Sequence, residues 1–299
     1  MSIDFKQLIL RQTAEPGHRF ARLWRRFHAH PLALLALAIL IVVITLSLCA
    51  PLISRYLTKT SPERVQVLHT FEPISTHHWL GTDEYGRDVL TRVVYGGRAS
   101  LGIAFLAVGI ALSIGTLAGT LAAYYAGWVD MLIMRFVDVM LSIPSFFLLL
   151  LISSLVAIGP IALAVVIALL NWFGLARLVR AEVLTIKQRE YIVAARVVGM
   201  PNRAIIIRHI MPNVVHLLIV WATLAASGFI LTEAALSFLG LGVQLPTPSW
   251  GNMLNNAAHY FYTSVALACI PGCLITLTVL SLNLIGDALR DVLDPRIHQ

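Results

Sequence analysis

The main pattern along the chain is a series of long apolar stretches separated by shorter polar segments. Six stretches contain few or no charged residues, and they cover 32–53, 100–123, 137–158, 161–176, 214–240 and 265–285. A bilayer core of ~30 Å requires about 20 apolar residues per helix, so each stretch predicts one transmembrane helix. Solid apolar runs differ from the alternating strands of a transmembrane barrel. The sequence therefore predicts an all-α integral membrane protein with six transmembrane helices.

The first apolar stretch predicts a permanent anchor. Of the 299 residues, 58% are hydrophobic and 12% are charged, unlike an ordinary soluble domain. The stretch lies behind about thirty residues and is longer than a typical signal core. Cys49-Ala50-Pro51 also lacks the small-x-small pattern of a cleavage site.

Basic residues are distributed unevenly between the polar segments. Residues 1–31 contain six basic and two acidic side chains, and residues 177–212 contain seven basic and two acidic ones. Residues 241–264 contain no charged side chain. Because basic residues remain on the cytoplasmic side, both termini and 177–212 are predicted to be cytoplasmic. The 54–99 segment is long enough to be external despite its charges. No basic soluble module is present, so nucleic acid is not an expected partner.

Residues 190–213, EYIVAARVVGMPNRAIIIRHIMPN, predict two short helices at an angle on the cytoplasmic side. Gly199 can adopt the left-handed conformation that ends a helix, and Pro201 suits the first turn of the next one. Small alanines leave room for a partner, although a plain surface loop would also explain the charges. The predicted contact residues are Glu190, Ala194, Ala195, Arg196, Gly199, Arg203, His209 and Pro212.

This segment resembles the coupling loop of ABC importer permeases. That pattern is Glu-Ala-Ala, three residues, Gly, nine residues and a closing x-x-Leu-Pro, and Ala194, Ala195, Gly199 and Pro212 match it. Val193 stands in the Glu position and Met211 in the Leu position. Because Val193 removes a carboxylate that the family often uses, an ion pair with a partner would fall to Glu190 or another group.

The external segment 78–101 resembles a signature in permeases of oligopeptide and dipeptide importers. Thr82 or Asp83 is predicted to cap a short helix along the outer membrane face, with Val89, Val93 and Val94 on its apolar side. A solvated loop helix without a partner is the alternative. The residues that carry the signature are Gly81, Thr82, Asp83, Gly86, Arg87 and Asp88.

Two further segments support the same resemblance. Residues 236–254 resemble the outer-mouth loop of these permeases, in which Trp250 suits an interfacial position. Residues 283–299 are similar to their C-terminal end. The chain is thus identified as a member of the second of the two permease types that pair in oligopeptide and dipeptide importers.

The resemblance implies a division of the chain and a set of partners. The expected parts are a cytoplasmic tail at 1–31, the first helix with an external loop at 32–99, a permease core at 100–288 that includes the coupling loop at 177–212, and a cytoplasmic tail at 289–299. The implied location is the bacterial inner membrane. The implied partners are a homologous permease, two cytoplasmic ATPase subunits, an external binding protein, a peptide substrate and membrane lipid.

Several polar residues lie inside predicted spans. Glu233 is the one acidic residue well inside a span, and an uncompensated carboxylate there costs at least ~2.5 kcal/mol. It is predicted either to line a translocation path or to make a structural hydrogen bond, for example to Ser237. Asn171, Ser145 and Asn283 are weaker path candidates, for which polar packing between helices is the alternative. Gly115 and Gly119 have a helix-packing spacing that fits an intrachain contact or a subunit interface.

Missing motifs restrict the chemistry. The chain has three lysines, none after a glycine, so the phosphate-binding G-x4-G-K-[ST] loop is absent, as are His-Glu-x-x-His and Gly-x-Ser-x-Gly. We expect no catalysis, no metal site and no cofactor in this chain, with ATP and Mg²⁺ bound by the partner ATPases. Cargo alternatives are nickel, glutathione or a peptide antibiotic. Rival classes are a proton-driven transporter using Glu233 and an intramembrane enzyme, which lacks paired catalytic residues.

Overall fold

The computed structural model describes residues 27–156, 159–260 and 262–293. Within these ranges the chain is helical and forms no sheet, apart from one isolated bridge between Thr82 and Asp88. The helices are α3 (Pro31–Leu48), α4 (Ala50–Leu52), η1 (Ile53–Thr58), η2 (Val67–His69), α5 (Val89–Tyr125), α6 (Gly127–Leu141), α7 (Ser145–Leu155), α8 (Pro160–Leu169), α9 (Trp172–Lys187), α10 (Glu190–Val197), α11 (Asn202–Ile205), η3 (Ile206–Ile210), α12 (Met211–Phe238), α13 (Trp250–His259) and α14 (Ala266–Leu293).

The six predicted spans correspond to four single helices and two bent pairs. The single spans are α3, α5, the continuous helix Asn202–Phe238 and α14. The pairs α6 with α7 and α8 with α9 are bent by 77° and 43°. The prediction of an all-α membrane protein is therefore confirmed, with up to six crossings among the described residues.

Each bend lies at a residue that interrupts helical hydrogen bonding. Pro144, between α6 and α7, has no N–H to donate and disfavours a helical residue before it. Between α8 and α9, the Asn171 side-chain amide donates to the Ile167 carbonyl at 2.7 Å. The predicted boundaries 137–158 and 161–176 were too narrow, because α6 begins at Gly127 and α9 continues to Lys187.

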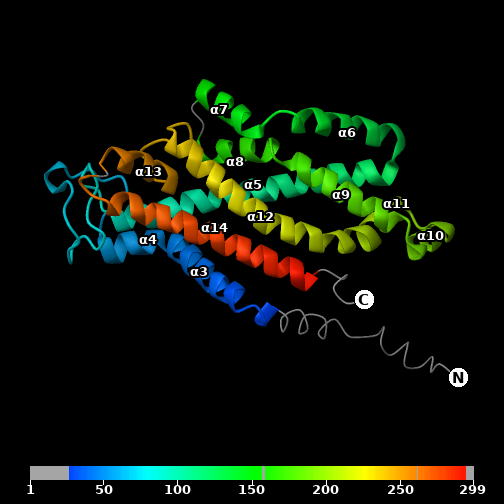
Figure 1. Ribbon diagram of the computed structural model, residues 1–299, viewed down its shortest axis with the longest axis horizontal. Coiled ribbons are helices and arrows are strands. Elements are labelled where there is room, and N and C mark those ends of the chain that lie inside the picture. Colours follow the sequence, from blue (N-terminus) through cyan, green and yellow to red (C-terminus); the bar gives the residue numbers. More distant parts are fainter. Residues whose placement is uncertain (1–26, 157–158, 261, 294–299) are drawn as a thin grey trace.

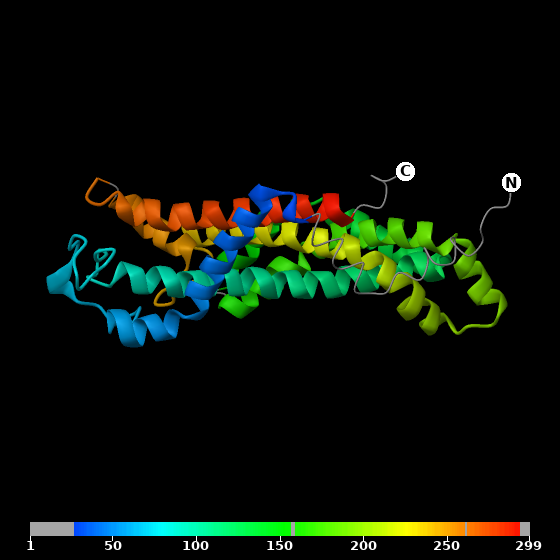
Figure 2. The ribbon, with the colours of Figure 1, turned by 90° about the horizontal axis from the view of Figure 1, so that it is seen from below.

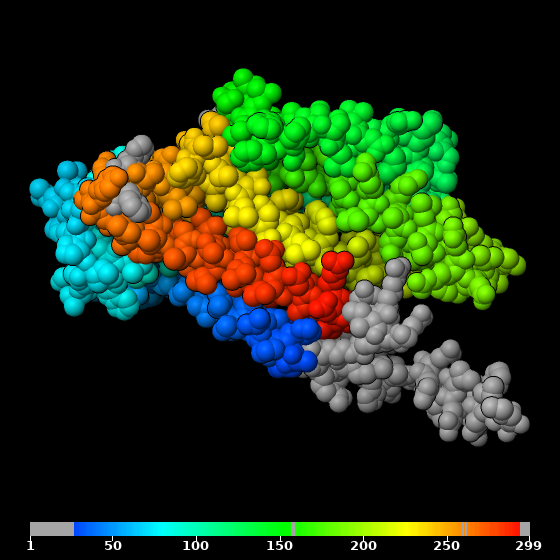
Figure 3. Space-filling model, in the orientation of Figure 1, coloured from blue at the N-terminus to red at the C-terminus, as the bar shows by residue number. Residues whose placement is uncertain are grey.

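The long helices run along the molecule, with the external loop at one end and the coupling loop at the other (Figures 1 and 2). Residues 59–88 form the cyan loop at the left of Figure 1, next to α13, whereas α10 lies at the right. Figure 3 shows α12 and α14 side by side across one face, with α3 along the edge of α14. The end of α14 points toward the coupling-loop end, as expected for a cytoplasmic C-terminus.

Close packing of α5 on α9 depends on two glycines. A Cβ atom at Gly115 would lie 2.9 Å from the Trp172 carbonyl oxygen, and one at Gly119 would lie 2.4 Å from the Ala176 carbonyl oxygen. Small residues at this spacing let helix backbones approach within a membrane. The Gly115–Gly119 spacing thus serves an intrachain contact.

Gly119→Ala is expected to lower the thermal unfolding midpoint of the detergent-solubilised protein, because the new methyl group meets backbone and overpacking costs about 1–3 kcal/mol. Gly109→Ala is the matched control on the same helix, since no atom lies within 4 Å of the added Cβ. The midpoint of the control is expected to be unchanged or raised. Equal midpoints for the two variants would contradict the packing assigned to α5 and α9.

Candidate functional site

The coupling loop consists of α10, a corner at Gly199, and a second helix that continues into the membrane. Gly199 has φ +81°, so it adopts the predicted left-handed conformation at the end of α10. The prediction of a separate second helix was wrong, because α11, η3 and α12 form one continuous helix over Asn202–Phe238. Pro212 therefore lies within this helix. The loop itself is shorter than 177–212, since α9 includes residues up to Lys187.

Buried isoleucines attach the coupling loop to the membrane helices. Ile192 of α10, Ile205 of α11 and Ile210 of η3 are completely buried. They pack in one apolar cluster with Tyr124 at the end of α5 and with the inner face of α9. The inner side of the loop is thus fixed by apolar contacts within this chain.

The outer side of α10 is exposed and apolar. Val197 and Val198 are 82% and 86% exposed, and Val193 is half exposed. Two exposed branched residues beside small alanines form a surface suited to the groove of a partner. Of the predicted contact residues, Ala195 and His209 are half-buried, and the exposed ones are Glu190, Ala194, Arg196, Gly199, Arg203 and Pro212.

The external signature forms a buried charge network. The Asp83 carboxylate accepts hydrogen bonds from the backbone N–H of Tyr85 and Arg87, both at 2.9 Å. It also pairs with the Arg87 guanidinium at 2.7 Å and the Arg92 guanidinium at 3.3 Å. Arg87, Arg92 and Asp83 are 5%, 1% and 5% exposed, so this is an interior network and not a solvated loop.

Asp88, and not Thr82 or Asp83, caps the helix that follows. Its carboxylate accepts from the Thr91 N–H at 2.8 Å and makes a second contact, 3.0 Å long, with His78 Nδ1. The helix that begins at Val89 is α5 itself, so the predicted separate surface helix is absent from this described segment. Thr82 instead donates to the His69 carbonyl and accepts from the Glu72 N–H, which closes the loop.

The two signature glycines occupy positions closed to other residues. Gly81 has φ +76° and Gly86 has φ +69°. A Cβ at Gly86 would lie 1.9 Å from the Gln66 carbonyl oxygen, and one at Gly81 would lie 2.6 Å from the Glu72 carbonyl oxygen. Both glycines thus allow the loop to fold back over the start of α5.

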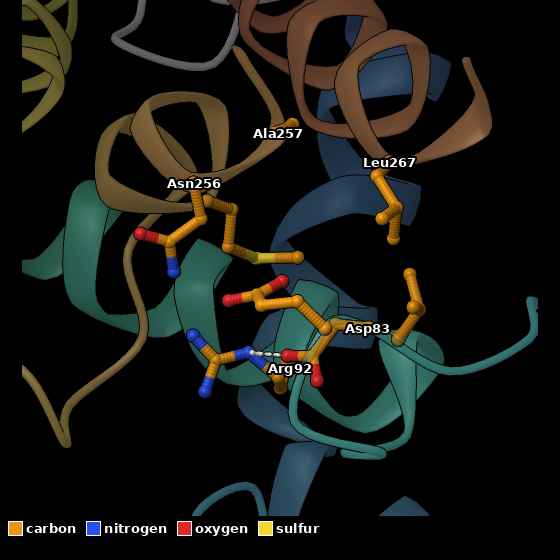
Figure 4. A pocket seen from close by; sticks show the side chains of 8 residues that line it. Asp83, Arg92, Asn256, Ala257 and Leu267 are labelled. Carbon is orange, nitrogen blue, oxygen red and sulfur yellow. Dashed lines mark ion pairs between the residues drawn. The ribbon is translucent and has the colours of Figure 1, made fainter. Parts of the chain in front are cut away.

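A small cavity lies between this loop, α5, α13 and α14, with the Arg92 guanidinium and the Asn256 amide at its wall (Figure 4). Its volume is about 10 Å³, roughly the space that one water needs, so a peptide cannot bind there. One terminal nitrogen of Arg92 has no hydrogen-bond partner among the described residues. Burial and the nearby Asp83 carboxylate raise the pKa of Glu84, because both disfavour another negative charge.

Glu233 is completely enclosed within the chain. One carboxylate oxygen accepts from the Ser100 hydroxyl of α5 and the other from the Ser237 hydroxyl of α12, both at 2.7 Å. Ser237 Oγ in turn accepts from the Val243 N–H, and Ser100 Oγ accepts from the Trp250 N–H. Glu233 therefore joins α5, α12 and the 239–249 loop.

Trp250 is interior and not interfacial as predicted, since it is 1% exposed. Its indole N–H donates to the Val93 carbonyl at 3.0 Å, which connects α13 to α5. The ring occupies the space beside Gly97, where a Cβ would lie 2.7 Å from it. The sequence position of a tryptophan does not distinguish an interior from an interfacial side chain, whereas the space beside Gly97 shows how this ring is accommodated.

The other polar residues predicted for a path make contacts between helices. The Ser145 hydroxyl lies 3.5 Å from the Asn171 side-chain oxygen, across the two bends. Asn283 accepts from the Ser227 hydroxyl at 2.7 Å, joining α14 to α12. These contacts agree with the polar-packing alternative, and a role in the path stays a prediction.

Two ion pairs join α6 to the helix of the next span. Asp138 pairs with Arg177 at 2.5 Å, and Asp130 forms a bidentate contact with Arg180 at 2.5 and 2.6 Å. Both pairs join α6 to α9, so each lies across the third and fourth spans and not within one helix.

A large groove lies between the coupling-loop halves of α5 and α12. Its volume is about 760 Å³, and its wall is mainly apolar. Ser113, Thr116 and Thr120 of α5 are among its lining residues, although the Thr116 hydroxyl is itself buried, and Arg203 lies at its coupling-loop end. The lining residues are Leu112, Ser113, Thr116, Leu117, Thr120, Leu121, Tyr125, Arg203, Ile206, Ile207, Met211 and Leu218.

Comparison with known families identifies the class of protein. Residues 115–299 match the family described as the binding-protein-dependent transport system inner membrane component. The chain belongs to this family. Residues 19–68 match the N-terminal TM domain of oligopeptide transport permease C. The chain is therefore a multi-pass inner membrane component and a transport subunit, not an enzyme, and it works with a binding protein.

Individual relatives cover nearly the whole permease. This chain is 41% identical over 276 residues to the dipeptide transport system permease protein DppC of Alkalihalophilus pseudofirmus, and the match covers 92% of this chain and 89% of the relative. It is 37% identical over 298 residues to the oligopeptide transport system permease protein OppC of Haemophilus influenzae, covering 98% and 95%. It is 38% identical over 286 residues to the glutathione transport system permease protein GsiD of Escherichia coli O157:H7, covering 96% and 92%.

Substitutions at Glu233 are expected to show whether the carboxylate joins helices. Glu233→Gln keeps the side-chain size and one of the two acceptor oxygens, so it should lower the thermal midpoint less than Glu233→Ala does. Glu233→Ala leaves two buried hydroxyls without their acceptor, at about 1–3 kcal/mol each, and should lower the midpoint. Fluorescence-detected size exclusion after heating measures both. A Gln variant as unstable as the Ala variant would argue against this joining role.

Proposed function

We propose that this chain is one of two homologous permease subunits in an ATP-driven importer of di- or oligopeptides. Two ATPase subunits would bind the cytoplasmic side, and an external binding protein would deliver the substrate. The observation that carries the proposal is the exposed apolar surface of α10 on a loop whose inner side is rigidly packed. ATP and Mg²⁺ would belong to the ATPase subunits, because this sequence has no phosphate-binding loop of the G-x4-G-K-[ST] type.

The geometry favours a mechanical role for the coupling loop. Force on α10 reaches α9 through the short 188–189 connection and reaches α12 through the continuous helix from Asn202. The α12 helix continues toward the external end, and α9 leads through the 43° bend into α8 (Figure 1). A displacement of the loop by ATPase closure would thus tilt two spans together, which is how we propose that the permease alternates between inward-open and outward-open states.

For the translocation path, the groove between α5 and α12 is the best-supported surface. Its wall is mainly apolar with Arg203 at its coupling-loop end, and we propose that a second permease subunit closes its open side. Among the described residues, Glu233, Asn171, Ser145 and Asn283 do not line this groove. We propose that these four hold the helices that surround the path.

The relatives support the proposed cargo class. Dipeptide and oligopeptide permeases support a peptide substrate, and the glutathione permease supports glutathione, itself a modified tripeptide, as the second candidate. Nickel or a peptide antibiotic remains an alternative within the same machine. Proton-driven transport has less support, because Glu233 is enclosed and hydrogen-bonded to two hydroxyls.

Depletion of a mixed pool from the medium tests the proposed function. The pool contains peptides of two to eight residues, glutathione and Ni²⁺, and mass spectrometry follows each component in cells with and without this chain. Selective, ATP-dependent depletion of peptides supports the proposal. Depletion of glutathione or Ni²⁺ alone would support an ATP-driven importer with that substrate in place of peptides. Uptake that persists without ATP would overturn the proposed function.

Gly199→Asp is expected to abolish ATP-driven uptake while the complex still assembles. The added side chain has open space within this chain but lies at the surface proposed for the ATPase, in a backbone conformation that disfavours side chains. Gly127→Asp is a matched control, because Gly127 also has a positive φ (+57°) and open space but lies at the start of α6. Uptake and co-purification are measured together. Normal uptake by the Gly199 variant, or equal loss in the control, would refute the coupling role.

A further inference from the structure

Tyr124, near the end of α5, contacts both arms of the coupling loop. Its hydroxyl donates a hydrogen bond to the Asn202 side-chain oxygen at 2.7 Å, at the start of α11. The Arg196 guanidinium of α10 lies 5.5 Å from the centre of its ring. The side chain is only 6% exposed. One aromatic residue is thus held between the two helices that meet at the Gly199 corner.

The backbone beside Tyr124 is also fixed. Lys187, the last residue of α9, donates from Nζ to the Tyr124 carbonyl at 2.7 Å and the Ala123 carbonyl at 3.1 Å. These carbonyls lie at the end of α5, where helical carbonyls have no intrahelical partner and a cation is favoured. The Lys187 ammonium also lies 5.7 Å from the Tyr124 ring. The ends of α5 and α9 are therefore joined at this residue.

The chain connectivity makes these contacts important for α5. The coupling loop is covalently continuous with α9 and α12, but α5 is joined to it only through side chains. The buried isoleucines supply apolar contact, which is non-directional. A hydrogen bond and a cation over an aromatic ring are directional. These contacts therefore add a preferred orientation of the α10–α11 corner against α5 to the apolar packing.

We propose that Tyr124 is a positioning residue that fixes the α10–α11 corner to the end of α5, so that force on the coupling loop moves α5 and is not absorbed by rotation at Gly199. This inference rests on the proposed function and names a residue that transmits its force. The helix that it engages is 37 residues long, or ~55 Å at 1.5 Å per residue. Its far end carries the Ser100 contact to Glu233 and the Val93 contact to Trp250. Motion at Tyr124 thus reaches the external half directly.

The test uses the complete complex, purified through a tag on this chain and reconstituted in liposomes with its binding protein. Phosphate release and uptake of radiolabelled trialanine are measured on the same vesicles, so that transport per ATP can be calculated. The variants are Tyr124→Phe, which removes the hydroxyl alone, and Tyr124→Leu, which also removes the ring. Tyr56→Phe and Tyr56→Leu are matched controls, because Tyr56 of η1 is 69% exposed and lies outside both the coupling loop and the groove.

We expect Tyr124→Leu to lower transport per ATP by about five- to tenfold and Tyr124→Phe by about two- to fivefold, from the sizes of the lost contacts. ATPase activity and subunit stoichiometry should persist, and the Tyr56 controls should match the wild type. Asn202→Ala should reproduce Tyr124→Phe, and the double variant should be no worse than either single one, as required if both remove the same hydrogen bond.

Three outcomes would overturn the inference. Unchanged transport per ATP in Tyr124→Leu would show that the corner needs no such anchor. A parallel fall in assembly, ATPase activity and uptake would make Tyr124 a stability residue only. An additive Tyr124→Phe/Asn202→Ala double variant would exclude the proposed hydrogen bond. Failure of the proposed function is distinct, since the wild-type complex itself would then show no ATP-driven uptake of any component of the mixed pool.

Discussion

Close backbone contact along α5 determines how the other helices can be arranged. Within a membrane, helices gain no hydrophobic driving force from each other, so their association depends on packing and on hydrogen bonds. Gly119 brings α5 against the carbonyl of Ala176, and Gly97 leaves space for the Trp250 ring. Both contacts would be lost with any added Cβ. Because α5 is held in this way at several points, α9 and α13 have fixed positions relative to it, and the two ends of the molecule are built on one continuous helix.

Hydrogen bonds satisfy the polar side chains that this packing buries. The Glu233 carboxylate is completely buried and accepts from two hydroxyls on different helices. At the external end, Asp83 is surrounded by N–H donors and two guanidinium groups. Removing one partner of such a group leaves a buried charge or dipole unsatisfied, which costs more than the contact itself contributes. The hydrogen bonds and ion pairs therefore fix the geometry of the external half, in addition to its apolar packing.

The sequence predicted the number of spans because apolar length is a direct measure of the bilayer thickness. It did not predict the bends, since hydropathy averages over residues such as Pro144 and Asn171, whose effects on backbone hydrogen bonds are local. Gly199 was predicted correctly because its left-handed conformation strongly favours glycine. The cap of α5 was misplaced by a few residues, since Thr82, Asp83 and Asp88 are all capable acceptors and only the three-dimensional register selects Asp88.

The two ends of the molecule differ in a way that fits a force-transmitting subunit. In the external loop Asp83 and Arg87 are enclosed and paired, whereas the charged residues of α10 and α11 are exposed. Both ends also expose apolar side chains, among them Leu68 in the external loop and Val197 and Val198 in the coupling loop, and such surfaces are suited to contact with a partner. The relatives named for dipeptide, oligopeptide and glutathione transport have 41%, 37% and 38% identity to this chain over nearly its full length. Similar identity across three cargo names means that most of the shared sequence encodes the helical frame and its coupling, and that little of it distinguishes one cargo from another.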